Sequence, residues 1–229
     1  MKTLKALSAL LSYPSEDLIE AVPEIRKVLV DEGLLGPQRL TDLAPLLNEL
    51  GSNDLYDLQE RYVLLFDRTR TLSLNLFEHI HGENRDRGSA MVDLLETYRA
   101  GGYDLDSSEL PDHLPVLLEF LSTRPLPEAR EMLVDAGHII AALAERLGKR
   151  DSSYTAVMTT LMALAAIDGD VPAELADVPD EDPEDLEALD AVWEEAEVTF
   201  GPDPNAGCPV SRDILAKMDP RSVAARPAE

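Results

Sequence analysis

The sequence DLIEAVPEIRKVLV, residues 17–30, carries apolar side chains one, three or four positions apart: Leu18, Ile19, Val22, Ile25 and Leu29. Side chains with this spacing share one face of an α-helix, and the charged residues between them lie on the other face. Pro23 is expected to kink this helix. The stretch therefore predicts an amphipathic helix whose apolar face packs against other elements.

The same period recurs through most of the chain. It marks helices within residues 40–50, 55–66, 91–98, 114–121 and 152–167, and one long helix over 128–147 that Gly148 closes. Asp112 is placed to cap the helix that begins near Leu114. The pattern predicts an all-α fold, a single-domain helical bundle of roughly eight to ten helices.

Residues 69–88 depart from this pattern. Leu72, Leu74 and Leu76 alternate with polar residues, as in a short strand. No second convincing strand is available to pair with it, and a lone strand leaves its backbone groups without partners. We therefore expect a tight loop or a short helix with one buried side.

The chain is strongly acidic, with a net charge of −25 and a pI of about 4.3. Such a field repels nucleic acid and anionic membrane surfaces, and it attracts basic partners. Five lysines against 15 arginines are also typical of a salt-adapted or high-GC source. Adaptation to salt and recognition of a basic partner are both open explanations for the acidity.

The acidity is concentrated towards the end of the chain, where residues 168–197 hold 14 acidic residues and no lysine or arginine. Residues 178–185 resemble a flexible acidic linker, and a helical stripe returns in 186–200. We expect a helical core over residues 1–177, this linker, a C-terminal helix over 186–200 that packs on the core, and a disordered tail over 201–229.

The cellular location is expected to be the cytoplasm. Cys208 is the single cysteine, so no internal disulfide can form. The N-terminus lacks a small-residue cleavage site after its short apolar stretch. No apolar run approaches the roughly 20 residues that a membrane span needs.

Motifs of catalysis and metal binding are missing from the sequence. His79 and His81 are two residues apart, which directs them to different sides of a helix, and neither HExxH nor CxxC occurs. There is no GxSxG motif and no glycine-rich cofactor loop. We expect no catalytic residue, no metal and no bound cofactor, and a hydrolase that uses a carboxylate and His113 is a weak alternative.

One charged stretch is not explained by a helical core. The sequence FEHIHGENRDRG, residues 77–88, mixes both signs of charge with two histidines and two glycines. It either forms salt bridges that hold neighbouring helices together or shapes a groove for a ligand.

This stretch, with its surroundings, resembles the NarJ-type nitrate reductase assembly chaperones of the TorD-like group. The matching blocks are residues 62–68, 76–88, 90–95, 110–115, 118–121 and 189–195. The resemblance implies an all-helical chaperone that binds the apo catalytic subunit of nitrate reductase, largely through the N-terminal segment of that subunit. It also implies that the chaperone keeps the subunit competent for insertion of molybdenum cofactor and an iron–sulfur cluster, and leaves before the enzyme docks at the membrane.

A protein with this role needs a groove with an apolar floor and an acidic rim, which would take a basic amphipathic peptide helix. The residues that we expect to line or shape this groove are Tyr62, Phe66, Phe77, Glu78, His79, His81, Glu83, Arg85, Arg87, Asp112, His113 and Glu119. Tyr62 and Phe66 are also suited to the core, and Arg85 and Arg87 can pair internally with Glu78 and Glu83. The molybdenum cofactor is expected to come from separate delivery proteins.

Two other functions remain open at this level. The chain could serve another molybdoenzyme, such as a dimethyl-sulfoxide or selenate reductase, although the 77–88 block is typical of the nitrate reductase branch. It could also be an acidic adaptor or scaffold that uses residues 178–185 as its contact.

Deletion of residues 178–185 separates the adaptor from the chaperone. An adaptor loses its partner when its acidic contact is removed, whereas a protein that binds its client in a groove of the core keeps most of its affinity. The measurement is capture of the partner by the full-length and deleted chains. If the deleted chain captures no partner although circular dichroism shows that its core is still helical, the prediction that the client binds in a groove of the core is contradicted.

Overall fold

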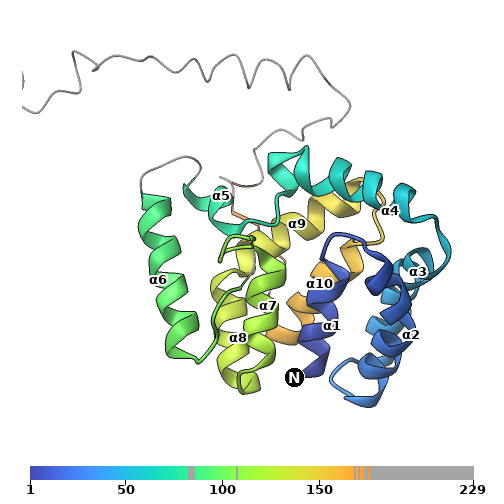
Figure 1. Cartoon of the computed structure of the whole chain (residues 1–229), viewed down its shortest axis with the longest axis horizontal. Coiled ribbons are helices and arrows are strands. Elements are labelled where there is room, and N and C mark those ends of the chain that lie inside the picture. Colours follow the sequence, from blue (N-terminus) through green and yellow to red (C-terminus); the bar gives the residue numbers. More distant parts are fainter. Residues whose placement is uncertain (82–85, 107, 168, 170, 173–174, 176–229) are drawn as a thin grey trace, which may run out of the picture. The chain divides into compact units, whose positions relative to one another are not determined.

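The structure is a computed structural model that describes residues 1–81, 86–106, 108–167, 169, 171, 172 and 175 (Figure 1). All of these belong to one compact unit that ends at Asp185. The predicted linker 178–185, helix 186–200 and tail 201–229 lie outside the described residues and stay predictions.

The described residues form ten α-helices and no β-strand, which confirms the all-α prediction. The helices are α1 (Lys2–Leu10), α2 (Glu16–Asp31), α3 (Pro37–Ser52), α4 (Leu55–Tyr62), α5 (Leu76–His81), α6 (Asp86–Ala100), α7 (Leu114–Ser122), α8 (Leu126–Asp135), α9 (Gly137–Lys149) and α10 (Thr155–Ala165). A π-helical turn, η1 (Val63–Asp67), continues α4, and a 3-10 turn, η2 (Arg70–Leu72), follows it. None of the described helices is both long and apolar enough to cross a membrane.

The core lies where α1 packs against α7 and α9 packs against α10. Leu7, Leu10 and Leu11 at the end of α1 are completely buried, and α7 buries every residue from Leu114 to Leu118. Helices α2 and α3 pair beside α1, and α6 stands at the opposite edge of the unit (Figure 1). Burying a leucine contributes about 1.5–3 kcal/mol, so this leucine-rich seam is a main source of stability.

The long helix predicted over residues 128–147 is wrong, because two helices occupy this range. Helix α8 ends at Asp135 and α9 begins at Gly137, with Ala136 between them. A Cβ atom at Gly137 would lie 3.1–3.3 Å from side-chain atoms of Ile167, so glycine permits this close approach. The apolar period continues through the break, and for that reason the sequence pattern did not reveal it.

The leucines of the irregular stretch are buried, as predicted. Leu72, Leu74 and Leu76 are at most 4% exposed, within a 3-10 turn, a connection and the start of α5. Their backbone also has a partner that the sequence did not reveal, since the N–H of Leu114 donates to the Leu74 carbonyl at 2.8 Å and that of Leu76 to the Asp112 carbonyl at 3.1 Å. This single antiparallel bridge ties α5 to the start of α7.

Asp112 does not cap the helix that follows it, so that prediction is wrong. The N-cap of α7 is His113, without a side-chain hydrogen bond. The fully buried Asp112 carboxylate instead accepts a hydrogen bond from the Phe77 N–H, at 2.9 Å, in the first turn of α5. Burial raises the pKa of Asp112, and the Phe77 N–H and the charge of Arg87 act in the opposite direction.

Asp112→Ala removes this cap between segments and is expected to lower the free energy of unfolding by about 1–3 kcal/mol. Asp112→Asn keeps an acceptor for the Phe77 N–H and should lower the free energy of unfolding by a smaller amount. Because the folded pKa of Asp112 is raised, its ionisation costs stability as pH rises from the unfolded pKa to the folded one. The amide side chain of the Asp112→Asn variant does not ionise and avoids this cost. The stability of this variant relative to the native protein should therefore rise as pH rises from the unfolded to the folded pKa of Asp112.

Urea unfolding of the three proteins at a series of pH values measures both effects. Equal unfolding free energies for Asp112→Ala and the native protein would contradict the role of Asp112 as a cap.

Candidate functional site

The described chain contains a cavity of about 540 Å³, here called the acidic cavity. Its walls come from α1 and the connection after it, the end of α4 with η1, residues 103–106, Glu109, His113 and α7. Its carboxylates are Asp67, Asp104, Asp106, Glu109 and Glu119, and its apolar and aromatic side chains are Tyr13, Tyr62, Tyr103, Leu105, Pro115 and Val116. No lysine or arginine of the described chain lines it.

Two carboxylates of the acidic cavity, those of Asp67 and Glu109, repel each other. Burial and then the charge of Glu109 raise the pKa of Asp67. Burial also raises the pKa of the Tyr62 hydroxyl, and Asp67 adds to that rise. A cationic ligand would relieve this repulsion, so the cavity favours positive charge.

Helices α1 and α7 build the floor of the cavity. The Ser8 hydroxyl on α1 donates to the Pro115 carbonyl on α7 at 2.7 Å, in a buried position. The Tyr62 hydroxyl donates to the Leu11 carbonyl at 2.9 Å, and the Tyr62 ring meets the edge of Tyr13 at 5.5 Å between centroids. These bonds satisfy the Ser8 and Tyr62 hydroxyls and hold the Tyr62 ring in place.

The π-helical turn brings Asp67 into the same cavity as Tyr62. In an α-helix, residues five apart are rotated by about 140° and lie on different faces. Within η1 the N–H of Arg68 bonds to the carbonyl of Val63, five residues earlier, at 3.0 Å, so residues five apart lie on the same side. A turn of this kind is frequent at functional sites.

A second hollow of about 440 Å³, here called the tyrosine groove, lies on the other side of α4 and η1. Tyr13 lines both hollows. The other lining residues of the groove are Tyr56, Asp57, Gln59, Glu60, Val63, Leu64 and Arg68. Tyr13 and Tyr56 are 49% and 79% exposed, so the groove offers aromatic surface to solvent.

Three of the twelve residues predicted for the groove line the acidic cavity: Tyr62, His113 and Glu119. Burial lowers the pKa of His113, and Glu109, with an oxygen 3.7 Å from Nδ1, partly offsets that shift. Glu119 pairs with Lys5 at 3.2 Å near the surface. Phe66 is buried below the cavity, against Tyr62.

The predicted residues of the 77–88 block lie elsewhere, around α5 and α6. Arg87 pairs with Glu78 at 3.3 Å, and Phe77 donates its N–H to Asp112. His79 Nε2 lies 2.8 Å from the Ser73 carbonyl, and burial lowers the pKa of this histidine. These contacts hold α5 in place. Glu83, Arg85 and the side chain of His81 lie outside the described residues.

Several lining residues were missed by sequence reasoning. They are Ser8, Ser12, Tyr13, Asp67, residues 103–106 and Glu109. Each comes from a connection or a helix end, where periodicity carries no information. The density of acid in 104–109 was the one available signal, but in a chain with 45 acidic residues it is weak. Within the described residues, no group of three potential ligands could hold a metal ion.

The family model described as nitrate reductase delta subunit matches residues 18–160. The chain belongs to the nitrate reductase delta subunit family. Relatives that are named as NarJ-type chaperones confirm the resemblance seen in the sequence.

Relatives of this delta-subunit chain carry consistent names. A protein of Escherichia coli K12 named nitrate reductase molybdenum cofactor assembly chaperone NarJ is 44% identical over 210 residues, 90% of this chain and 88% of that protein. NarW of the same strain, named as a probable chaperone of this kind, is 38% identical over 213 residues, 91% and 87% of the two chains. A Bacillus subtilis protein, also named as a probable chaperone NarJ, is 33% identical over 164 residues, 70% and 86% of the two chains.

These relatives are named as assembly chaperones or probable assembly chaperones, and none of these names is that of a catalytic enzyme. Membership of this family confirms the prediction that the delta-subunit chain is not an enzyme and argues against the hydrolase alternative.

Glu109→Gln tests the electrostatics of the acidic cavity. Removing the charge of Glu109 should lower the pKa of Asp67 towards its ordinary value, because Glu109 is the one charged group found to raise it. Carboxyl carbon NMR titration measures this pKa. Glu119→Gln is the matched control, since Glu119 lines the same cavity without shifting Asp67. An unchanged pKa in Glu109→Gln would contradict the described geometry.

Proposed function

We propose that this protein is an assembly chaperone for the apo catalytic subunit of a respiratory nitrate reductase, and that it binds the basic N-terminal segment of that subunit. The names of its relatives support the role. The observation that carries the binding proposal is the acidic cavity, where five carboxylates and no described lysine or arginine surround a hollow of about 540 Å³. Such a site attracts a basic segment and repels acidic ones.

The client segment is an amphipathic helix in this proposal. Its basic side enters the acidic cavity, where Tyr103 and Tyr13 offer ring surface for the stems of lysine and arginine side chains. Its apolar side lies in the tyrosine groove against Tyr56 and Leu64. Tyr13 borders both hollows, so one helix can occupy both, as in other helix-in-groove complexes.

Binding of this kind serves assembly without chemistry. The chaperone holds the N-terminal segment while separate delivery proteins supply the molybdenum cofactor and the iron–sulfur cluster, and it leaves before the enzyme docks at the membrane. The process takes place in the cytoplasm in this proposal. The nitrate reductase named in the relatives favours this client over another molybdoenzyme.

Calorimetric titration with a synthetic peptide tests the proposal. The peptide is the first 15 or so residues of the nitrate reductase catalytic subunit from the same genome, which span about 22 Å as a helix. We expect micromolar or tighter affinity that weakens severalfold between about 50 mM and about 500 mM salt, because salt screens the carboxylates. The absence of binding at either salt concentration, with the protein folded, would contradict N-terminal recognition.

Charge-neutral variants locate the contact within the protein. Asp67→Asn and Glu109→Gln should each weaken the peptide about two- to fivefold and reduce the dependence on salt. Glu131→Gln is the matched control, because Glu131 is an exposed carboxylate of α8 that lines neither hollow. Equal losses in all three variants would indicate general charge attraction instead of a defined cavity.

A further inference from the structure

Helix α4 and η1 form the wall between the two hollows, but few residues anchor this wall. Tyr62 and Asp67 face the acidic cavity, while Tyr56 and Leu64 face the tyrosine groove. Of the eight residues of α4, only Leu58 and Tyr62 are buried. Among the described elements, α4 makes extensive contact with η1 alone, which is its own continuation. The position of this wall therefore depends on a small number of side-chain contacts.

On one side, the wall is tied to the connection between α1 and α2. The Gln59 amide donates to the Pro14 carbonyl, and the Tyr62 hydroxyl donates to the Leu11 carbonyl, both at 2.9 Å. These two bonds flank Tyr13, which borders both hollows.

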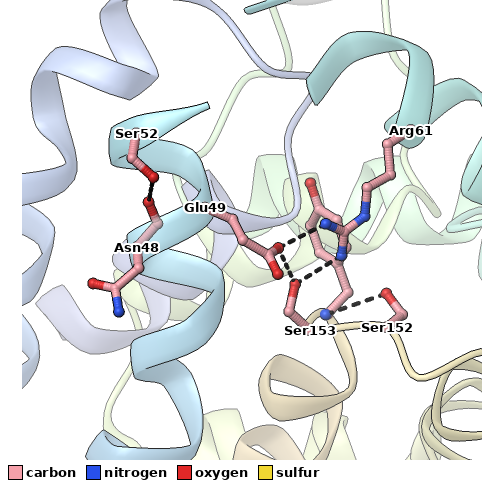
Figure 2. A network of polar contacts seen from close by, with 7 residues as sticks. Asn48, Glu49, Ser52, Arg61, Ser152 and Ser153 are labelled. Carbon is pink, nitrogen blue, oxygen red and sulfur yellow. Dashed lines mark hydrogen bonds and ion pairs between the residues drawn. The ribbon is translucent and has the colours of Figure 1, made fainter. Parts of the chain in front are cut away.

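On the other side, a closed triangle of polar contacts holds the wall (Figure 2). Arg61 Nη1 donates to Glu49 Oε2 at 2.7 Å, the Ser153 hydroxyl donates to the same oxygen at 2.6 Å, and Arg61 Nη2 donates to Ser153 Oγ at 2.9 Å. Arg61 belongs to α4, Glu49 to α3, and Ser153 to the connection between α9 and α10. The Arg61 and Glu49 side chains are 34% and 31% exposed, so about two thirds of each is shielded from water.

Tyr154 links this triangle to the acidic cavity. The centroid of its buried ring lies 5.9 Å from Arg61 Cζ. The ring also packs edge-to-face with Phe66 and Tyr62, at centroid distances of 5.1 Å and 6.4 Å. Tyr62 in turn lines the cavity and contacts Tyr13. The ring cluster thus transmits the position of the connection between α9 and α10 to the wall.

We propose that the Glu49–Arg61–Ser153 triangle is a positioning clamp that sets the wall between the hollows and so sets the affinity for the client segment. None of the three residues lines either hollow. The clamp acts only through the placement of Tyr62 and η1, and its effect on affinity rests on the proposed client binding.

Paired neutral variants test the clamp by titration with the N-terminal peptide. Arg61→Gln and Glu49→Gln should each weaken the peptide about fivefold or more, and the double variant should bind no more weakly than the worse single variant, because both remove the same contact. Arg39→Gln is the matched control: Arg39 pairs with Asp42 at 3.2 Å on α3, with similar exposure, and lines neither hollow. It should leave the affinity unchanged.

Titrations are made well below the unfolding temperature of each variant, which circular dichroism determines. If Arg61→Gln does not fold, Arg61→Lys replaces it, since one ammonium group cannot reproduce the two-pronged contact. Folded clamp variants that bind the peptide as tightly as the native protein would overturn the proposal. Additive losses in the double variant would also overturn it.

Amide hydrogen exchange gives a readout that is independent of the client. Exchange in residues 55–67 should become faster in Arg61→Gln and Glu49→Gln, while exchange in α2 stays as in the native protein. A general loss of stability would speed exchange in both regions. Unchanged exchange in 55–67 overturns the clamp even if the native protein does not bind the peptide, so the failure of the clamp and that of the proposed function can be distinguished.

Discussion

The packing of α1 against α7 is the contact on which both the fold and the site depend. The leucines of α1 are buried against a helix that itself has almost no exposed residue over its first two turns. The seam also carries the buried hydrogen bond from Ser8 to Pro115, and both residues form part of the cavity floor. Because α1 leads into Tyr13 and α7 begins just after Asp112, this one contact positions two walls of the cavity and the bridge to α5.

The sequence predicted those features that depend on neighbours along the chain. The stripe of α2 is an example: Leu18, Val22, Ile25 and Leu29 are buried, Ile19 is partly buried against the core, and Pro23 lies within a helix that continues to Asp31. The period of apolar residues is a local property, so it survives without knowledge of the tertiary structure. The same reasoning joined α8 and α9, because the apolar period continues through Ala136, where one helix ends and the next begins.

The candidate site was harder to predict, because its residues come from distant parts of the sequence. Ser8, Tyr62, Glu109 and Glu119 meet only after α1, η1 and α7 have packed. Tyr62, His113 and Glu119 were predicted through a family resemblance, and spacing alone would not have selected them. Asp67 depends on a π-helical turn, which no pattern of apolar residues announces.

The unusual composition of residues 77–88 has a partial structural explanation. Phe77, Glu78 and His79 each contact a group outside their own helix, namely Asp112, Arg87 and Ser73. These contacts brace α5 against the segment that leads to His113 in the cavity wall. Residues 77–79 thus help to hold one wall of the acidic cavity in place, while the residues that line the cavity come from other parts of the chain.

Photo-cross-linking shows most directly whether the acidic cavity is the client site. A photoreactive group is placed at a basic position of the N-terminal peptide of the nitrate reductase catalytic subunit, and the linked residues are mapped by mass spectrometry. Contact in the cavity predicts links to residues 8–13, 62–67 and 103–119. Links confined to residues 77–100, with none at the cavity, would contradict it.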